Sequence, residues 1–411
     1  MSFTFPNAPH FDKASCDALP VVWVSDENAL YQLIDEIDDS DIIALDTEFI
    51  KRTTYYPILA LVQVNTGRAI YLVDAPKLDL HEFWQALIEV PTMVWYACGE
   101  DLGIFYLLAK NAPLTNVFDV QIAIGYLTGK LQVGYSQSIK EVLGIELDKG
   151  ESQSNWLARP LSQEQEHYAV NDVRYLLALY QATTDALHAK NTLEFVIEDS
   201  LTYAKELHAA QAIPDDELYL EFIAPNYNRQ QLSVLKQLIL WRENLARSTN
   251  EPRSYIIGKQ ALREIVMDMP TTIKGLARTT LNRHALRLYG DEMIRLIKSA
   301  KSLDADELPP LPPPVYTSKD KPFKKALDRA IDEHSEAIGV PRDLLLRSRH
   351  VAVLLLMVYQ KDNQDSFDVA NLPDSLLGYR KAWIIETVLP LLATFKPQIE
   401  QGFLAGENER V

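Results

Sequence analysis

The hydrophobic pattern changes near the middle of this 411-residue chain, and that change is the strongest constraint on its fold. Before Pro214, short apolar runs at 42–45, 58–64 and 93–97 alternate with stretches of helical periodicity. Strands that alternate with helices predict a mixed sheet covered by helices, which is an α/β domain. After Pro214 the apolar residues recur every three to four positions, so we predict that the second half is helical.

A proline-rich segment divides this helical half. The run PPLPPP at 309–314 cannot continue a helix and favours an extended linker. A chain of this length also exceeds one ordinary hydrophobic core, so several domains are expected. We therefore predict an α/β domain over 1–212, a helical domain over 213–305, a linker over 306–319 and a second helical domain over 320–411.

Charge is distributed unevenly along the chain. The net charge is −17, and residues 1–212 contain 13 Lys+Arg against 30 Asp+Glu. Residues 225–300 instead contain 13 basic and 6 acidic residues, so this segment is basic. A local basic face can bind phosphate whatever the total charge of the protein. A solvated helical surface explains the same pattern equally well, so charge alone leaves nucleic-acid binding open.

The composition excludes several classes of protein. No stretch approaches the roughly 20 uninterrupted apolar residues that a membrane-spanning helix needs, and residues 1–20 lack the basic and apolar regions of a signal peptide. Cys16 and Cys98 are the only cysteines, which excludes a disulfide framework and a thiolate zinc site. We therefore expect a cytoplasmic protein without a membrane partner.

Two acidic residues stand at the end of the first buried-type strand. Asp46 and Glu48 are two positions apart, and alternate residues of a strand point to the same face, so their carboxylates can converge. Two such groups repel each other unless a cation lies between them. Strands often end in acidic residues on their way to solvent, so this pair alone is weak support for a metal site.

Further acidic residues occupy two helices. Asp101 falls in the first turn of the helix that follows the run 93–97, where a negative charge also suits the helix dipole. Tyr168 and Asp172 are four residues apart on a helix predicted to start after Ser162, so they share a face. Each position has a structural alternative: a helix-capping group for Asp101, and a surface carboxylate beside a packed tyrosine for Asp172.

The joint occurrence of these groups at a strand, a strand-to-helix junction and a helix is stronger support than any one of them. Four carboxylates without thiolates suit hard divalent ions such as Mg²⁺ or Mn²⁺. A pair of such ions about 4 Å apart can activate water and stabilise the leaving oxygen in phosphodiester cleavage. The pattern therefore favours metal-dependent phosphodiester hydrolysis.

The same segments resemble the three exonuclease motifs of the ribonuclease D family, within the 3′–5′ exonucleases that have four acidic residues and a tyrosine. DTEF with TYYPILALVQ after it, EDL after a strand, and WLARPLS followed by YAVND carry this resemblance, which covers residues 20–205. Residues 233–265 resemble the helicase-and-RNase-D C-terminal (HRDC) domain. Residues 320–403 look like a divergent second copy of it.

The resemblance implies an RNase H-like 3′–5′ exonuclease domain with a mixed sheet, followed by two small all-α domains of the HRDC type. The expected activity releases 5′-mononucleotides from the 3′ end of RNA. Its substrates would include tRNA precursors with single-stranded 3′ ends, so RNA is the expected partner, and we expect a monomer. A DNA-directed 3′–5′ exonuclease and a non-catalytic RNA-binding protein remain as alternatives.

The resemblance also assigns roles to individual residues. Asp46, Glu48, Asp101 and Asp172 would hold two divalent ions, Mg²⁺ or Mn²⁺, and Tyr168 would orient the attacking water. A free tyrosine has a pKa near 10, which suits an orienting group better than a general base.

Five residues are weaker candidates for substrate binding. Lys51, Arg52 and Tyr55 directly follow the first motif, and Arg242 and Arg253 lie in the basic segment. Positive charge can hold phosphate, and an aromatic ring can stack a base. We therefore predict that these positions contact RNA, with packing in the core as an equal alternative for Tyr55.

Two positions depart from the family pattern. Relatives often have histidine where this chain has Tyr96, and aspartate where it has Asn155. Neither position belongs to the expected metal ligands. The departures therefore bear on substrate positioning more than on activity.

Overall fold

The computed structural model describes residues 11–147, 150, 154–317, 321–360 and 372–408. The chain forms two compact units. The first comprises 1–50, 59–211 and 320–396, and the second comprises 51–58, 212–319 and 397–411. Residues 320–396 are thus grouped with the α/β domain, and the second HRDC-type domain over 320–411 stays a prediction.

The first unit is built on a mixed six-stranded sheet, as predicted. The strand order is β1-β4-β3-β2-β5-β6. Strand β3 runs antiparallel to β4, whereas the pairs β1–β4, β2–β5 and β5–β6 are parallel. The strands are β1 (Val21–Val24), β2 (Ile42–Ile50), β3 (Ile58–Asn65), β4 (Ile70–Val73), β5 (Thr92–Trp95) and β6 (Val117–Asp119).

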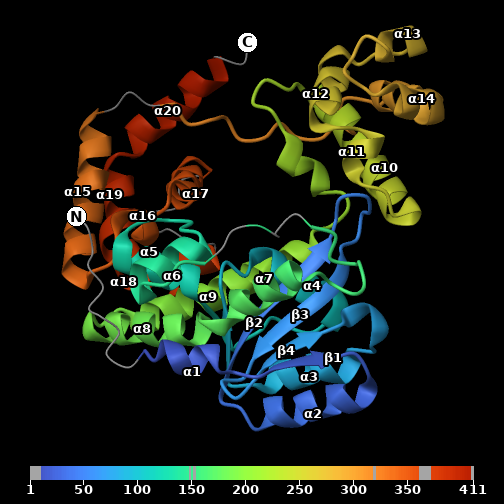
Figure 1. The fold of residues 1–411 in the computed structure, drawn as a ribbon. Helices are drawn as coiled ribbons and strands as arrows, with labels where there is room; N and C mark the ends of the chain where they lie inside the picture. Colours follow the sequence, from blue (N-terminus) through green and yellow to red (C-terminus); the bar gives the residue numbers. More distant parts are fainter. Residues whose placement is uncertain (1–10, 148–149, 151–153, 318–320, 361–371, 409–411) are drawn as a thin grey trace. The chain divides into compact units, whose positions relative to one another are not determined.

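Helices cover both faces of this sheet (Figure 1). Strand β4 shows the alternation that allows this, because Tyr71 and Val73 belong to one hydrophobic core and Ile70 and Leu72 to another. The first core contains residues of α2 (Glu27–Asp38), α3 (His81–Glu89) and α4 (Gly99–Ala109), and the second contains residues of α7 (Gln163–Arg174). The face toward α7 receives Asp46 and Glu48, since Ile43 and Leu45 of β2 lie in the first core.

The remaining helices of the first unit come from both halves of the chain. Those before residue 212 are α1 (Lys13–Asp17), α5 (Val120–Thr128), α6 (Tyr135–Leu143), α8 (Leu176–Ala189) and α9 (Leu193–Ala209). Those after residue 320 are α15 (Lys321–Ile338), α16 (Arg342–Leu345), α17 (Ser348–Tyr359), α18 (Lys381–Trp383) and α19 (Leu389–Thr394). The helix that follows, α20 (Lys396–Asn408), is grouped with the second unit from residue 397 on. A buried ion pair between Arg380 and Asp199 links the later segment to α9, with 2.6 Å between Nη1 and Oδ1.

The second unit is helical and has its own hydrophobic core. Its helices between residues 212 and 319 are α10 (Arg229–Thr249), α11 (Arg253–Ile256), α12 (Lys259–Asp268), α13 (Ile273–Leu276) and α14 (Arg283–Lys301). A capping box between Asn228 and Gln231 starts α10. The prolines at 309–314 are not helical, and Arg229 donates hydrogen bonds to the carbonyls of Leu308 and Pro309. Within the described part of the chain, no helix has the length and hydrophobicity to cross a membrane.

Candidate active site

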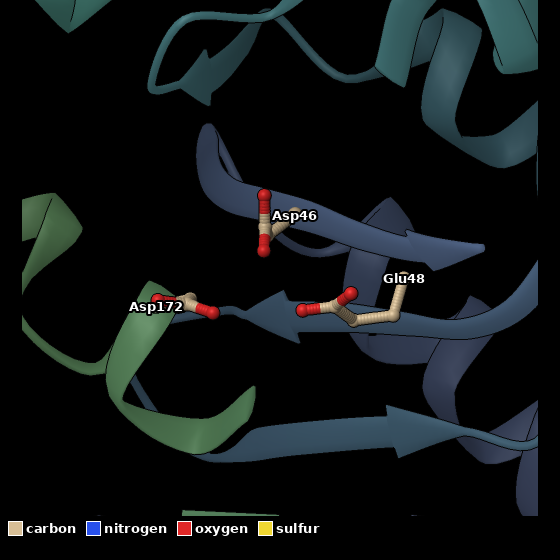
Figure 2. Close-up of side chains that lie close together, drawn as sticks. All are labelled: Asp46, Glu48 and Asp172. Carbon is tan, nitrogen blue, oxygen red and sulfur yellow. The ribbon is translucent and has the colours of Figure 1, made fainter. Parts of the chain in front are cut away.

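Three carboxylates meet between β2 and α7. One oxygen from each of Asp46, Glu48 and Asp172 lies within 4.8 Å of the other two. Figure 2 shows the three side chains directed toward one another. The two-residue spacing on a strand therefore brings Asp46 and Glu48 to one face as predicted, and α7, which packs on that same face, adds the third group.

This arrangement is electrostatically unfavourable without a cation. Burial raises the pKa of Asp46, and the neighbouring carboxylates raise it further. Burial and the same repulsion raise the pKa of Glu48 to about 9 and that of Asp172 to about 8. None of these carboxylates forms an ion pair with a described Lys or Arg. An all-oxygen cluster whose charges lack protein cations fits a hard divalent metal ion.

Asp101, in the first turn of α4, lies beside this cluster and is positioned by a residue of β2. Its carboxylate accepts a hydrogen bond from the buried hydroxyl of Thr47. Thr47 stands between Asp46 and Glu48 and points to the opposite face of β2, toward the first turn of α4. Burial raises the pKa of Asp101 to about 6, and the Thr47 hydroxyl opposes that shift. Thr47 thus fixes the fourth carboxylate, a role that the motif alone did not reveal.

Replacing Thr47 with valine is expected to weaken Mn²⁺ binding roughly tenfold or more, because groups that orient metal ligands typically contribute 10–100-fold to affinity. Valine keeps the shape of the side chain and removes the hydroxyl that Asp101 accepts. Calorimetric Mn²⁺ titration of wild type, Thr47→Val and Thr47→Ser measures this effect. Thr47→Ser keeps the hydroxyl and is the matched control. Equal Mn²⁺ affinity in all three proteins would exclude this positioning role.

Metal binding at the cluster is expected to release protons. The raised pKa values of Glu48 and Asp172 mean that protons occupy part of the cluster near neutral pH, and a cation must displace them. Apparent Mn²⁺ affinity should therefore rise with pH from 6 toward 9, by roughly tenfold per pH unit for each proton displaced. Titrations at pH 7 in two buffers of different ionisation enthalpy count the protons. An affinity independent of pH would contradict this expectation.

Tyr168 reaches the same cluster from α7. The capping box between Ser162 and Gln165 starts this helix, as the sequence predicts. Burial raises the pKa of Tyr168, and Asp172 and Glu48 raise it further. The phenol therefore stays protonated at neutral pH and can hold a water molecule by hydrogen bonding, but it cannot act as a base.

Tyr135 was not found from the sequence. Its hydroxyl donates to the carbonyl of Asn171 at 3.1 Å, and burial, Asp172 and Asp46 all raise its pKa. Its ring lies edge-on to Tyr96, with 5.2 Å between ring centroids. Tyr135 stands outside the three motifs, so no sequence signal connected it to the carboxylates.

The two departures from the family pattern have local partners. Tyr96 donates to the carbonyl of Val133 at 2.6 Å and shares a hydrogen bond with Ser138. The side-chain oxygen of Asn155 accepts from the backbone N–H of Leu157 at 3.3 Å. Both residues therefore contribute to local structure next to the motifs.

The weaker substrate-binding candidates differ in their exposure to solvent. Lys51 and Arg52 are exposed, so the structure leaves their predicted RNA contact open. Arg242 is only 3% exposed, its Nη1 donates to the carbonyl of Ile257, and its guanidinium lies 4.9 Å from the centre of the Phe222 ring. Burial of this guanidinium argues against the predicted contact with RNA.

Tyr55 and Arg253 contact each other inside the second unit. The Tyr55 hydroxyl donates to Glu243, and the Arg253 guanidinium pairs with the same carboxylate and lies 4.7 Å from the centre of the Tyr55 ring. The backbone N–H of Tyr55 donates to the carbonyl of Asn250 at 3.1 Å. These contacts give both residues a structural role, and RNA binding by either stays a prediction.

Comparison with known proteins identifies relatives along most of the chain. A family model described as 3'-5' exonuclease matches residues 21–188, and an HRDC domain model matches residues 231–297. Ribonuclease D of Pseudomonas paraeruginosa is 33% identical over 381 residues, which cover 90% of this chain and 97% of the relative. Ribonuclease D of Shewanella sp. is 30% identical over 377 residues, covering 90% and 93%.

A solved structure matches the fold over nearly the same length. The crystal structure of Escherichia coli RNase D, described as an exoribonuclease involved in structured RNA processing, has a TM-score of 0.80 and 25% sequence identity. The match covers 92% of this chain and 100% of the other.

Proposed function

Because the chain belongs to the ribonuclease D family, we propose that it trims the 3′ ends of tRNA precursors and related structured RNAs. It is a 3′–5′ exoribonuclease that depends on divalent metal ions. The observation that carries the proposal is the meeting of Asp46, Glu48 and Asp172, which form no ion pair with any Lys or Arg in the described part of the chain.

The proposed mechanism uses this chain's residues as ligands and orienting groups. Asp46, Glu48, Asp101 and Asp172 would hold two ions, Mg²⁺ or Mn²⁺. When bound, such ions would supply the acidity that turns water into a nucleophile and the charge that stabilises the leaving oxygen. Protonated Tyr168 would hold that water in line with the terminal phosphodiester, and each cycle would release a 5′-mononucleotide.

The second unit would contribute affinity rather than chemistry. Its exposed basic residues include Lys259, Arg263, Lys274, Arg278, Arg283 and Arg287, and the nearby Tyr255 is 50% exposed. Exposed positive charge with an aromatic ring suits a single-stranded RNA backbone. We propose that this surface, and not the buried Arg242, holds the substrate upstream of its 3′ end.

Changing Lys259 and Arg263 together to glutamine is expected to weaken RNA binding at low salt and to flatten its salt dependence. Each lost phosphate contact should reduce the slope of log affinity against log salt by roughly 0.7. Fluorescence anisotropy with labelled RNA from 50 to 200 mM salt measures the slope. The exposed pair Lys324 and Lys325 in α15 is the control, changed in the same way. An unchanged slope would remove these two residues from the RNA surface.

A direct assay tests the proposed function. A 5′-labelled tRNA precursor with a short 3′ extension is incubated with the protein and Mg²⁺ or Mn²⁺, with and without chelator, beside a DNA strand of the same sequence. Stepwise shortening of the RNA from its 3′ end, lost with chelator, is the expected result. Faster shortening of the DNA would favour the DNA-directed alternative. Tight RNA binding without shortening under any metal condition would favour a non-catalytic binding protein.

A further inference from the structure

A buried carboxylate outside the active-site cluster holds the turn that begins α4. Asp119 ends β6, where it pairs with Trp95 of β5, and it is only 1% exposed. Its Oδ1 accepts the backbone N–H of Ala97 at 3.0 Å, and its Oδ2 accepts that of Cys98 at 3.1 Å. The same Oδ1 accepts the N–H of Gln121 at 2.8 Å and so caps α5. One carboxylate therefore ties the end of β5 to the starts of two helices.

The turn held by Asp119 has a conformation that a residue with a Cβ rarely adopts. Ala97 has a φ of 57°, in the left-handed region that is unfavourable for any residue but glycine. The N–H of Gly99 donates to the Ala97 carbonyl at 2.7 Å, and a Cβ at Gly99 would lie 2.6 Å from the Tyr203 hydroxyl of α9. An unfavourable backbone conformation persists only where its surroundings hold it, and such residues cluster at functional sites.

This turn determines where Asp101 lies. Cys98 is the N-cap of α4, and its carbonyl accepts the first hydrogen bond of the helix at 2.9 Å. Asp101 stands in that first turn, and its carboxylate accepts the Thr47 hydroxyl. The backbone of Asp101 is therefore placed by the hydrogen bonds of Asp119, and its side chain by Thr47. A change of φ at Ala97 would reorient the first turn of α4 and move the Asp101 carboxylate.

The chemistry of this contact requires a carboxylate. Asp119 forms no ion pair with a Lys or Arg of the described ranges, so backbone N–H groups alone face its charge. Burial raises the pKa of Asp119, and the N–H groups of Ala97, Cys98 and Gln121 oppose that shift. A carboxylate offers two oxygens that only accept, which suits three converging donors. Asparagine would turn an NH₂ group toward one of these N–H groups and could not satisfy all three.

We propose that Asp119 is a positioning residue for the metal site, because through Ala97 and Cys98 it holds Asp101 where a divalent ion needs it. This role rests on the proposed function, in which the carboxylates bind metal for RNA cleavage. Asp119 itself contacts neither metal nor RNA. Its loss should therefore weaken metal binding and slow cleavage while leaving the affinity for RNA unchanged.

The first experiment compares Asp119→Asn with wild type and with a packing control. Groups that orient metal ligands contribute about 10–100-fold to metal affinity, so Asp119→Asn should weaken calorimetric Mn²⁺ binding about tenfold or more. The kcat on an RNA 3′ end should fall by a similar factor with KM unchanged. The control, Ile37→Val, removes one buried carbon from α2 in the hydrophobic core that also contains Cys98. It should lower thermal stability without changing Mn²⁺ affinity.

A double variant tests whether Asp119 acts through the turn. Glycine adopts positive φ without the steric cost that alanine has, so Ala97→Gly makes the turn less dependent on Asp119. Asp119→Asn combined with Ala97→Gly should recover most of the lost Mn²⁺ affinity, and Ala97→Gly alone should bind Mn²⁺ as wild type does. A double variant that recovers none of the affinity would overturn the role of the turn.

Hydrogen exchange with chelator present gives a readout that needs neither metal nor turnover. The backbone amides of residues 97–101 should exchange faster in Asp119→Asn than in wild type, and those of α2 should not. Faster exchange with unchanged Mn²⁺ affinity would overturn the positioning role. A wild type that neither binds Mn²⁺ nor shortens RNA would overturn the proposed function together with this inference. Unchanged Mn²⁺ affinity in Asp119→Asn beside an active wild type would overturn this inference alone.

Discussion

Asp46→Asn is expected to lower kcat on an RNA 3′ end by about a thousandfold or more, which corresponds to roughly 4 kcal/mol of transition-state stabilisation. The carboxylate of Asp46 interacts with the other three acidic residues, since Asp101, Asp172 and Glu48 each raise its pKa. Asparagine keeps the size of the side chain and removes the charge that a divalent ion requires. Single-turnover rates on the labelled tRNA precursor, at saturating Mg²⁺, measure the loss.

A control variant and a measurement of thermal stability distinguish loss of catalysis from loss of the folded structure. Asp41→Asn changes an exposed carboxylate just before the same strand, and its rate should stay within about twofold of wild type. Asp46→Asn removes a half-buried charge that the neighbouring carboxylates repel, so with chelator the variant should be at least as heat-stable as wild type. The rise in melting temperature on adding Mn²⁺ should shrink or vanish, because that rise depends on metal affinity. Activity of Asp46→Asn within tenfold of wild type would exclude Asp46 as an essential ligand.

Part of this site could be predicted because local periodicity decides it. A two-residue spacing on a strand brings Asp46 and Glu48 to one face, and a four-residue spacing on a helix does the same for Tyr168 and Asp172. These statements need only the element type, which the hydrophobic pattern gives. The meeting of the two pairs depends on α7 packing over the sheet, which no local spacing predicts. The joint occurrence of the acidic groups and the family resemblance pointed to it.

The remaining features depend on long-range packing. The sequence allowed Asp101 to be either a helix cap or a metal ligand, because the Thr47 hydrogen bond exists only once β2 and β5 are paired, with Ile43 opposite Met93. Tyr135 comes close to Asp172 through the packing of α6, which no motif describes. Neither contact has a sequence signature.

The burial of Arg242, in contrast, is predictable from the apolar spacing of α10. This residue follows Leu235, Leu238 and Ile239 at helical spacing, so it continues the buried stripe of α10. Its positive charge suggested a contact with RNA. Its position on the helix instead predicts a buried side chain, as the structure shows.

Arg380→Met is expected to destabilise the first unit by about 3–5 kcal/mol, the usual loss when one partner of a buried ion pair is removed. Arg380 is 2% exposed, and its Nη1 and Nη2 lie 2.6 and 2.8 Å from the two oxygens of Asp199. It also donates to the carbonyls of Leu344 and Leu345, so one guanidinium links α9 to α16. Without it, Asp199 keeps only the hydrogen bond from the Tyr126 hydroxyl, at 2.6 Å, as a side-chain partner among the described residues.

Chemical denaturation followed by tryptophan fluorescence measures this loss, with Arg342→Met as the surface control. Arg342 is 45% exposed and pairs with exposed aspartates, so its loss should cost no more than about 1 kcal/mol. Adding Asp199→Asn to Arg380→Met should recover part of the stability, because the stranded charge is then gone. A single Arg380→Met variant within 1 kcal/mol of wild type would mean that residues 320–396 are held to α9 by their apolar contacts. Additive effects of the two substitutions would lead to the same conclusion, whereas recovery in the double variant would assign the attachment to the ion pair.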